Sequence, residues 1–138
     1  MNNENSVAVG RSEQPRPTVL IVDDDPGIRD GLGEFLAEEG FTVSTASEGV
    51  EALKILSTGM KPVAILLDVM MPPMDGWDFR QRQLIDETLA EIPTIVISAA
   101  GFSADSIRAQ FGDVEFLPKP IPVLTLLKAL REAAGSRG

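Results

Sequence analysis

The chain has 138 residues, of which 43% are hydrophobic and 24% charged, proportions typical of one globular domain. It contains neither cysteine nor histidine, which excludes disulfides, thiolate nucleophiles and metal sites built from those side chains. The formal net charge of −9 argues against direct binding of nucleic acid, which requires a basic surface.

The N-terminal segment, residues 1–17, is polar and carries two prolines near its end. We expect it to be a flexible tail, and residues 18–138 to form the folded domain. The apolar runs are too short to cross a bilayer, and the N-terminus lacks the pattern of a secretory signal. A cytoplasmic protein without membrane contact is therefore expected.

Short apolar runs alternate with amphipathic segments along the rest of the chain, which predicts strands that alternate with helices. The run at Val19–Val22 is typical of a buried parallel strand, and Asp25 before Pro26 is typical of a helix N-cap. Gly40 is placed to end that helix. In chain order the expected elements are a strand at Val19–Val22, a helix from Pro26 to Gly40, a strand at Phe41–Ala46, a helix from Val50 to near Gly59, a strand at Val63–Leu67, a helix from near Trp77, a strand at Thr94–Ile97, a helix at Ser103–Phe111, a strand at Val114–Leu117 and a helix that carries Val123 to Ala134.

Five strand–helix units in succession predict an α/β fold whose parallel sheet is covered on both faces. Right-handed crossovers make the sheet doubly wound, and we expect the flavodoxin-like strand order 2-1-3-4-5 with five helices. Ligands of such sheets bind beyond the carboxyl ends of the strands, where the strand order reverses. Here that position lies between the first and third strands.

The residues that follow the strands supply complementary polar groups. The first strand runs into Asp23 and Asp24, the third into Asp68, the fourth into Ser98 and the fifth into Lys119. Three carboxylates at one sheet edge repel one another, and a divalent cation held by oxygen removes that repulsion. Because Mg²⁺ prefers carboxylates, water and phosphate oxygens, these residues predict a cation and a phosphoryl group together.

A carboxylate in such a site can attack phosphorus and form an aspartyl phosphate. The Ser98 hydroxyl and the Lys119 ammonium can bind phosphoryl oxygens and offset their charge. Each residue alone has a plainer interpretation: Asp68 as a turn residue, Asp25 as a helix cap, a lone serine or lysine as exposed surface. The convergence of four strand ends on one location favours the phosphoryl site.

Four motifs in this order resemble the response regulator receiver domains of bacterial two-component systems. They are Val19–Pro26 (VLIVDDDP), Leu66–Gly76 (LLDVMMPPMDG), Pro93–Ala99 (PTIVISA) and Phe116–Pro120 (FLPKP), within a match over about residues 18–134. The resemblance implies that Asp68 is the phospho-acceptor and that Ser98 and Lys119 bind the phosphoryl group. It implies Mg²⁺, for which Mn²⁺ can substitute, held by Asp23, Asp24, Asp68 and the backbone carbonyl of Met70, with no other cofactor.

The resemblance also implies a cis peptide bond between Lys119 and Pro120, and a switch in which Ser98 moves toward the phosphoryl group while Phe116 turns inward. An ordinary core aromatic is the alternative for Phe116. The surface formed by the helix at 103–111, the fifth strand and the last helix would then signal to a protein effector. The implied phosphoryl donor is a histidine kinase or a histidine phosphotransfer protein, and the chain would be a monomer or a weak homodimer.

Together these features predict a stand-alone response regulator that is not an enzyme, because it catalyses only its own phosphorylation and dephosphorylation. The initial Met and the Ser-Arg-Gly end favour an intact small protein. The alternatives are a phosphorelay shuttle to a histidine phosphotransfer protein, and a receiver excised from a larger regulator or hybrid kinase. A phosphatase is disfavoured because no second acid–base carboxylate lies close after Asp68, in Asp68–Met70. A flavin site is disfavoured because the acidic loop at 23–25 would repel a phosphate.

Overall fold

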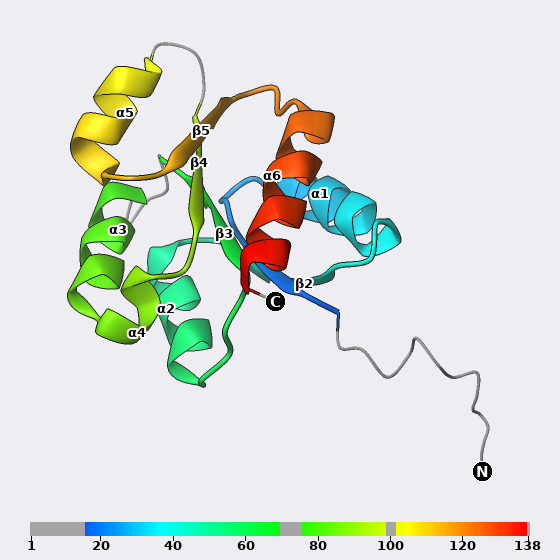
Figure 1. Ribbon diagram of the computed structural model, residues 1–138, viewed down its shortest axis with the longest axis horizontal. Helices are drawn as coiled ribbons and strands as arrows, with labels where there is room; N and C mark the ends of the chain where they lie inside the picture. The colour runs from blue at the N-terminus through cyan, green and yellow to red at the C-terminus, as the bar shows by residue number, and fades with distance from the viewer. Residues whose placement is uncertain (1–15, 70–75, 99–101, 138) are drawn as a thin grey trace.

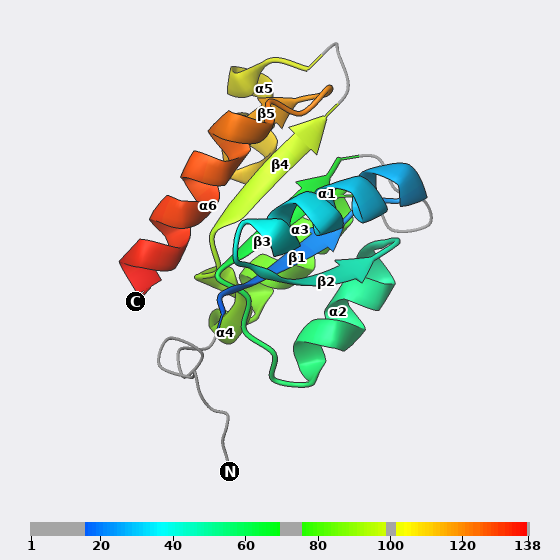
Figure 2. The ribbon, with the colours of Figure 1, turned by 90° about the vertical axis from the view of Figure 1, so that its right-hand side faces the viewer.

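The computed structural model describes residues 16–69, 76–98 and 102–137, and within them five parallel strands form one sheet in the order β2-β1-β3-β4-β5. The expected flavodoxin-like order is thereby confirmed. The sheet is covered on both faces: α1 and α6 lie on one side, and α2, α3, α4 and α5 on the other (Figures 1 and 2). The elements are β1 (Thr18–Val22), α1 (Pro26–Glu38), β2 (Thr42–Ala46), α2 (Gly49–Ser57), β3 (Ala64–Asp68), α3 (Gly76–Ile85), α4 (Glu87–Ala90), β4 (Thr94–Ser98), α5 (Ala104–Phe111), β5 (Glu115–Pro118) and α6 (Val123–Arg137).

The expected number of helices is wrong: the described residues contain six, because the one-turn helix α4 follows α3. Asp86 interrupts α3 and caps α4, since its carboxylate accepts hydrogen bonds from the Thr88 backbone N–H at 2.9 Å and from the Thr88 hydroxyl at 2.7 Å. A four-residue helix has too few positions to show an apolar period, so the sequence pattern did not reveal it.

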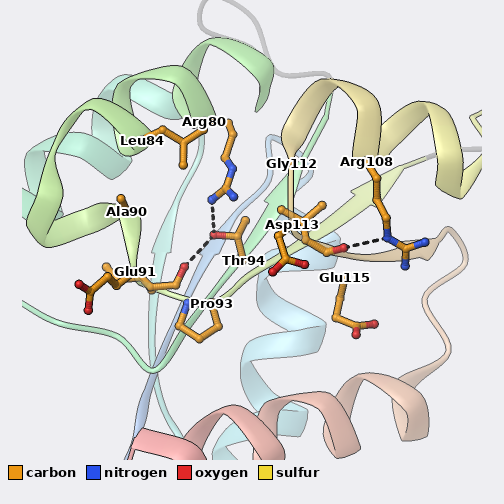
Figure 3. A pocket seen from close by; sticks show the side chains of 12 residues that line it. Arg80, Leu84, Ala90, Glu91, Pro93, Thr94, Arg108, Gly112, Asp113 and Glu115 are labelled. Atoms are coloured by element: carbon orange, nitrogen blue, oxygen red, sulfur yellow. Dashed lines mark hydrogen bonds between the residues drawn. The ribbon is translucent and has the colours of Figure 1, made fainter.

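A buried arginine, Arg80, joins α3 to the amino-terminal end of β4. Arg80 is 5% exposed, and its Nε donates to the Phe111 carbonyl at 2.8 Å, while Nη1 donates to Gln83 Oε1 at 3.0 Å and to Thr94 Oγ1 at 3.3 Å. Burial lowers the pKa of Arg80, and the nearby Asp113 carboxylate opposes this shift. Arg80 lines a pocket of about 640 Å³ at the starts of β4 and β5 (Figure 3), so this pocket lies at the other end of the sheet from the strand-end carboxylates.

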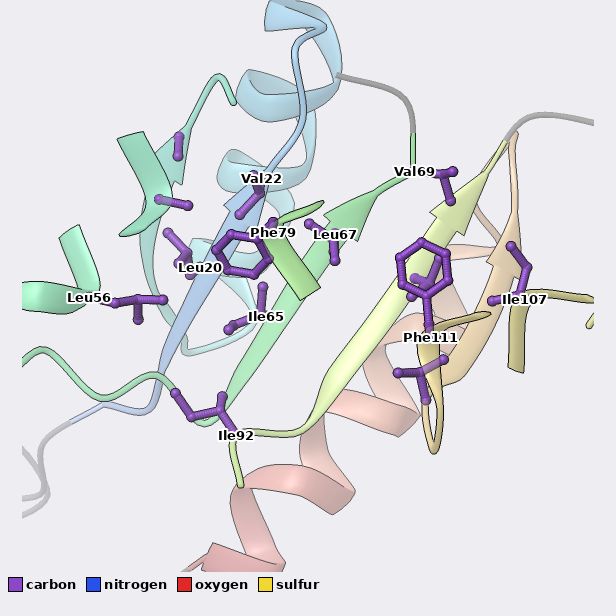
Figure 4. Packing of buried hydrophobic residues seen from close by; sticks show 14 residues of the cluster. Leu20, Val22, Leu56, Ile65, Leu67, Val69, Phe79, Ile92, Ile107 and Phe111 are labelled. Atoms are coloured by element: carbon purple, nitrogen blue, oxygen red, sulfur yellow. The ribbon is translucent and has the colours of Figure 1, made fainter. Parts of the chain in front are cut away.

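The apolar core has two layers because every central strand is buried on both faces. Leu20 and Val22 face one layer, where Phe79 from α3 and Phe111 from α5 also pack (Figure 4). The intervening residues of β1 face the second layer with α1 and α6. Burial on both faces explains why the strands read as continuous apolar runs rather than alternating ones.

The connection from β1 to α1 is set by a helix cap. As expected, Asp25 is the N-cap: its carboxylate accepts from the backbone N–H of Gly27 at 2.8 Å and of Ile28 at 3.4 Å. The helix ends before Gly40, whose φ of 101° lies in the left-handed region that favours glycine. The cap holds the acidic turn at the carboxyl end of β1.

Candidate functional site

Parallel pairing of β1 with β3 brings the strand-end carboxylates together. Val22 is in register with Leu67, so Asp23 and Asp68 leave neighbouring strands at the same level. Asp23 is 1% exposed and Asp68 5%, whereas Asp24 is exposed. Each of the three residues places a carboxylate oxygen so that these oxygens all lie within 4.8 Å of one another. The predicted acidic cluster therefore exists in the folded chain.

Lys119 extends from the end of β5 to this cluster. Its Nζ lies 3.2 Å from Asp23 Oδ2 and 3.6 Å from Asp68 Oδ2, and its side chain is 23% exposed. Burial by itself would lower the pKa of Lys119, but the charges of Asp68 and Asp23 outweigh burial and raise the pKa above its usual value. The backbone N–H of Lys119 donates to the Ser98 carbonyl at 2.8 Å, and the bond between Lys119 and Pro120 is cis, as expected.

Three of the four polar atoms of Asp23 make a hydrogen bond, each with a different partner. Its N–H donates to the Ala46 carbonyl at 3.1 Å, its carbonyl accepts from Arg29 Nη1 at 2.7 Å, and Oδ1 accepts from the Asp25 N–H at 2.9 Å. Oδ2 is buried and has no hydrogen-bond donor in suitable geometry among the described residues; Lys119 provides charge at 3.2 Å. One oxygen of Asp23 therefore faces the cluster with unused acceptor capacity.

This arrangement fits a hard divalent cation. Three carboxylates converge, and one of them, Asp23, has a buried oxygen that accepts no hydrogen bond from the described residues. Mg²⁺ binds through carboxylate oxygens of this kind. The single ammonium of Lys119 cannot neutralise three carboxylates. The donor set therefore has both the chemistry and the excess negative charge that such a cation requires.

Close packing at Gly76 connects the cluster to α3. The Gly76 N–H donates to the Val69 carbonyl at 2.7 Å, and a Cβ at this position would lie 2.4 Å from the Asp68 carbonyl oxygen. Only glycine fits at that separation without a shift of the backbone. In the sequence Gly76 stands out only as the end of a motif, because the approach of α3 to β3 is a tertiary contact.

The remaining predicted residues lie on β4 and β5 or outside the described part of the chain. Ser98 is 1% exposed at the end of β4, in register with Pro118 of β5. Phe116 is half-buried and packs against the core layer that contains α3 and α5, an environment that suits either of its two interpretations. Met70, the predicted source of a carbonyl ligand, lies outside the described residues.

Arg29 is a site residue that sequence analysis missed. It is partly buried on α1, and its bond to the Asp23 carbonyl spans six positions of the sequence. The arginine lies one turn after the N-cap Asp25, and its own N–H donates to the Asp25 carbonyl at 3.0 Å. An arginine one turn into a helix beside an acidic turn was the available signal.

Comparison with known proteins identifies one family. The model of the response regulator receiver domain matches residues 19–131. The chain is 35% identical over 116 residues to the DNA-binding dual master transcriptional regulator RpaA of Synechocystis sp., covering 83% of this chain and 48% of that protein. The chain spans about half the length of the curated relatives it matches.

Solved structures give the same family. The chemotaxis protein CheY4 of Vibrio cholerae matches with a TM-score of 0.75 and 30% identity, covering 86% of this chain and 99% of that one. The signal receiver domain of a signal transduction histidine kinase from Syntrophus aciditrophicus matches with a TM-score of 0.77 and 27% identity, covering 87% and 91%. In the described part of the chain, the helices are too short or too polar to traverse a lipid bilayer.

Proposed function

The chain belongs to the response regulator receiver domains of two-component signal transduction, and we propose that Asp68 accepts a phosphoryl group in a reaction that requires Mg²⁺. The observation that carries this proposal is the cluster of three carboxylates with the ammonium of Lys119 between Asp23 and Asp68. Asp68 is the last residue of the central strand β3, whereas Asp23 follows the neighbouring strand β1 and Lys119 follows β5, two strands away.

Asp23, Asp24 and Asp68 would hold the Mg²⁺ ion, with the Met70 carbonyl as a further proposed ligand. When bound, the ion supplies positive charge to the phosphoryl oxygens and relieves the repulsion among the carboxylates. Mn²⁺ offers the same coordination chemistry.

The side chains have distinct roles in the transfer. One oxygen of the Asp68 carboxylate forms the new bond to phosphorus, the bond from phosphorus to the donor breaks, and its electron pair stays with the leaving group. For a phosphohistidine donor, the released imidazole nitrogen then takes a proton from water. Lys119 offsets the charge of the phosphoryl oxygens, and the Ser98 hydroxyl donates a hydrogen bond to one of them. On this proposal the chain catalyses only its own phosphorylation and dephosphorylation.

We propose a histidine kinase or a histidine phosphotransfer protein as the donor, and a protein effector on the surface formed by α5, β5 and α6. Val123 and Leu124 of α6 are 40% and 76% exposed and give this surface apolar contact area. Ser98 and Phe116, the proposed switch residues, lie on β4 and β5 behind it. The net charge of −9 supports a chain that does not itself bind nucleic acid.

A stand-alone regulator is our first proposal for the whole protein. The chain is 35% identical to a regulator named as DNA-binding, and this similarity supports a second candidate: a receiver that controls a DNA-binding domain. A phosphotransfer assay separates these two candidates from a relay shuttle. When the phosphorylated chain is incubated with a purified histidine phosphotransfer protein, a regulator should keep the phosphoryl group on Asp68, whereas a shuttle should transfer it to that protein.

The central test uses acetyl phosphate as a small donor. Incubation of the chain with Mg²⁺ and acetyl phosphate should add one phosphoryl mass, and Asp68→Asn or removal of Mg²⁺ by EDTA should abolish the addition. Asp86→Asn is the matched control, because it removes an exposed carboxylate on α4 while an amide oxygen can still cap that helix. An unmodified wild-type chain under these conditions would rule out Asp68 as the phospho-acceptor.

A further inference from the structure

Arg29 makes a short hydrogen bond from α1 to the acidic turn. Its Nη1 donates to the Asp23 carbonyl at 2.7 Å, a charge-assisted hydrogen bond in a partly buried setting. Arg29 has no ion pair within 4.0 Å among the described residues, so its best-defined partner is this carbonyl rather than a carboxylate. A cation held by a backbone oxygen beside three carboxylates calls for an explanation beyond charge neutralisation.

The contact completes the anchoring of Asp23. The backbone N–H is held by β2 through Ala46, and Oδ1 is held by the N–H of Asp25, while the carbonyl is held only by Arg29 among the described residues. With the peptides on both sides of Asp23 restrained, rotation of the side chain is limited and Oδ2 stays directed at the Lys119 ammonium, 3.2 Å away. Arg29 therefore restrains the orientation of Asp23 Oδ2, which among the described residues is the one buried side-chain oxygen without a hydrogen-bond donor.

We propose that Arg29 is a positioning residue that raises the affinity of the acidic cluster for a divalent cation. The proposal rests on the proposed function only for the identity of the cation as Mg²⁺. Arg29 acts through the Asp23 backbone and is not a ligand. Groups that orient metal ligands in this way typically contribute a factor of about 10 to 100 in metal affinity.

The positive charge of Arg29 and its positioning of Asp23 should change the affinity for Mg²⁺ in opposite directions, so a binding measurement can separate the two effects. A positive charge close to the cluster repels Mg²⁺, so if charge alone mattered, removal of Arg29 would tighten Mg²⁺ binding. If orientation of Asp23 dominates, removal would weaken binding. The sign of the change in Kd therefore separates the two effects without reference to phosphorylation.

The experiment is a Mg²⁺ titration of the full chain, followed by calorimetry and by the fluorescence of Trp77. This is the one tryptophan in the sequence; it is 44% exposed and directly follows Gly76, whose backbone packs against the Asp68 carbonyl. Arg29→Gln should raise the Kd for Mg²⁺ about tenfold or more. The weakening should persist in about 1 M NaCl, where the screening length is about 3 Å and charge effects are largely suppressed.

Two further variants complete the design. Lys54→Gln removes an exposed cation of α2 and should leave the Kd unchanged or slightly lower, as charge alone predicts. Arg29→Lys keeps the charge but ends one bond short of Nη1, so it should also weaken binding, by less than Arg29→Gln; it serves as the test variant if Arg29→Gln does not fold. An unchanged or lower Kd in the Arg29 variants would overturn the inference, whereas failure of the wild-type chain to bind Mg²⁺ would instead overturn the proposed function.

Discussion

Lys119 and the two buried aspartates form a compact charge arrangement at the scale of single residues. Asp23 and Asp68 share one ammonium at 3.2 and 3.6 Å, and their combined charge outweighs the effect of burial on the pKa of Lys119. When no divalent ion is bound, the ammonium of Lys119 thus supplies part of the positive charge that the ion would supply. Its contribution to stability should be visible in the absence of Mg²⁺.

Lys119→Met in EDTA should lower the free energy of unfolding by about 1 to 3 kcal/mol at pH 7, because two buried carboxylates lose their shared cation. The pKa of Lys119 is raised in the folded chain, so its stabilisation is fully present below the unfolded lysine pKa of about 10.4 and is lost as the pH rises through the folded value. Urea unfolding of both proteins should therefore show a constant difference up to about pH 9.5 and a shrinking one above pH 10.4. A difference that grows with pH would contradict this assignment.

The close approach of α3 to β3 is the decisive contact at the scale of elements. Gly76 begins α3, and a Cβ there would lie 2.4 Å from the Asp68 carbonyl and 2.9 Å from the Val69 Cα. Both neighbours are backbone atoms, so they cannot rotate away as a flexible side chain would. The position of Asp68 is thus coupled to the start of α3.

Gly76→Ala should lower the free energy of unfolding by about 1 to 3 kcal/mol, the range seen when a packed site is overfilled. It should also slow phosphorylation of Asp68 by acetyl phosphate, because the end of β3 must shift. Gly31→Ala in α1 is the matched control: apart from its chain neighbours and the backbone of its own helix, no atom of the described residues lies within 4 Å of the added Cβ. Alanine there should raise stability by about 0.5 to 1 kcal/mol. Equal stability of Gly76→Ala and wild type in urea unfolding would refute the close packing.

Arg80 connects three elements at the opposite edge of the sheet, since it lies on α3 and binds Thr94 of β4 and the carbonyl of Phe111, the last residue of α5. Arg80→Met should lower the free energy of unfolding by about 1 to 3 kcal/mol, because the buried Phe111 carbonyl loses its donor. Hydrogen exchange should increase at the last turn of α5. Arg108→Met, an exposed arginine on the same pocket, should change stability by less than about 0.5 kcal/mol. Comparable losses in both variants would argue against a special role for Arg80.

For the whole molecule, the fold and the strand-end residues of the site were predictable from sequence for a shared reason. Buried parallel strands appear in the sequence as local apolar runs. The residue at the end of each run, such as Asp23 or Asp68, is therefore placed at the carboxyl edge of the sheet. Contacts between elements left no such local pattern. Arg29 on the Asp23 carbonyl, Gly76 against β3 and Arg80 beneath α5 depend on how helices are seated, and α4 is too short for periodicity.

Binding of a cation to the folded cluster alone should stabilise the whole domain. Mg²⁺ should raise Tm progressively, with about 1.4 kcal/mol of added stability for each tenfold increase in concentration above Kd. Asp23→Asn should abolish most of this dependence, since it removes a carboxylate from the cluster. Thermal unfolding in NaCl of matched ionic strength is the control, and an equal rise of Tm there would mean that general screening of the net charge is responsible.

The absence of cysteine and the presence of a single tryptophan make this domain unusually easy to equip with probes. One cysteine introduced at Leu124, which is 76% exposed on α6, would carry a dye at a single known position over the core layer of α1 and α6. Trp77 already reports from the start of α3 on the other face of the sheet, one residue after Gly76, which packs against the Asp68 backbone. Energy transfer between the two would follow, in one molecule and in real time, how far an event at Asp68 is felt at the proposed effector surface.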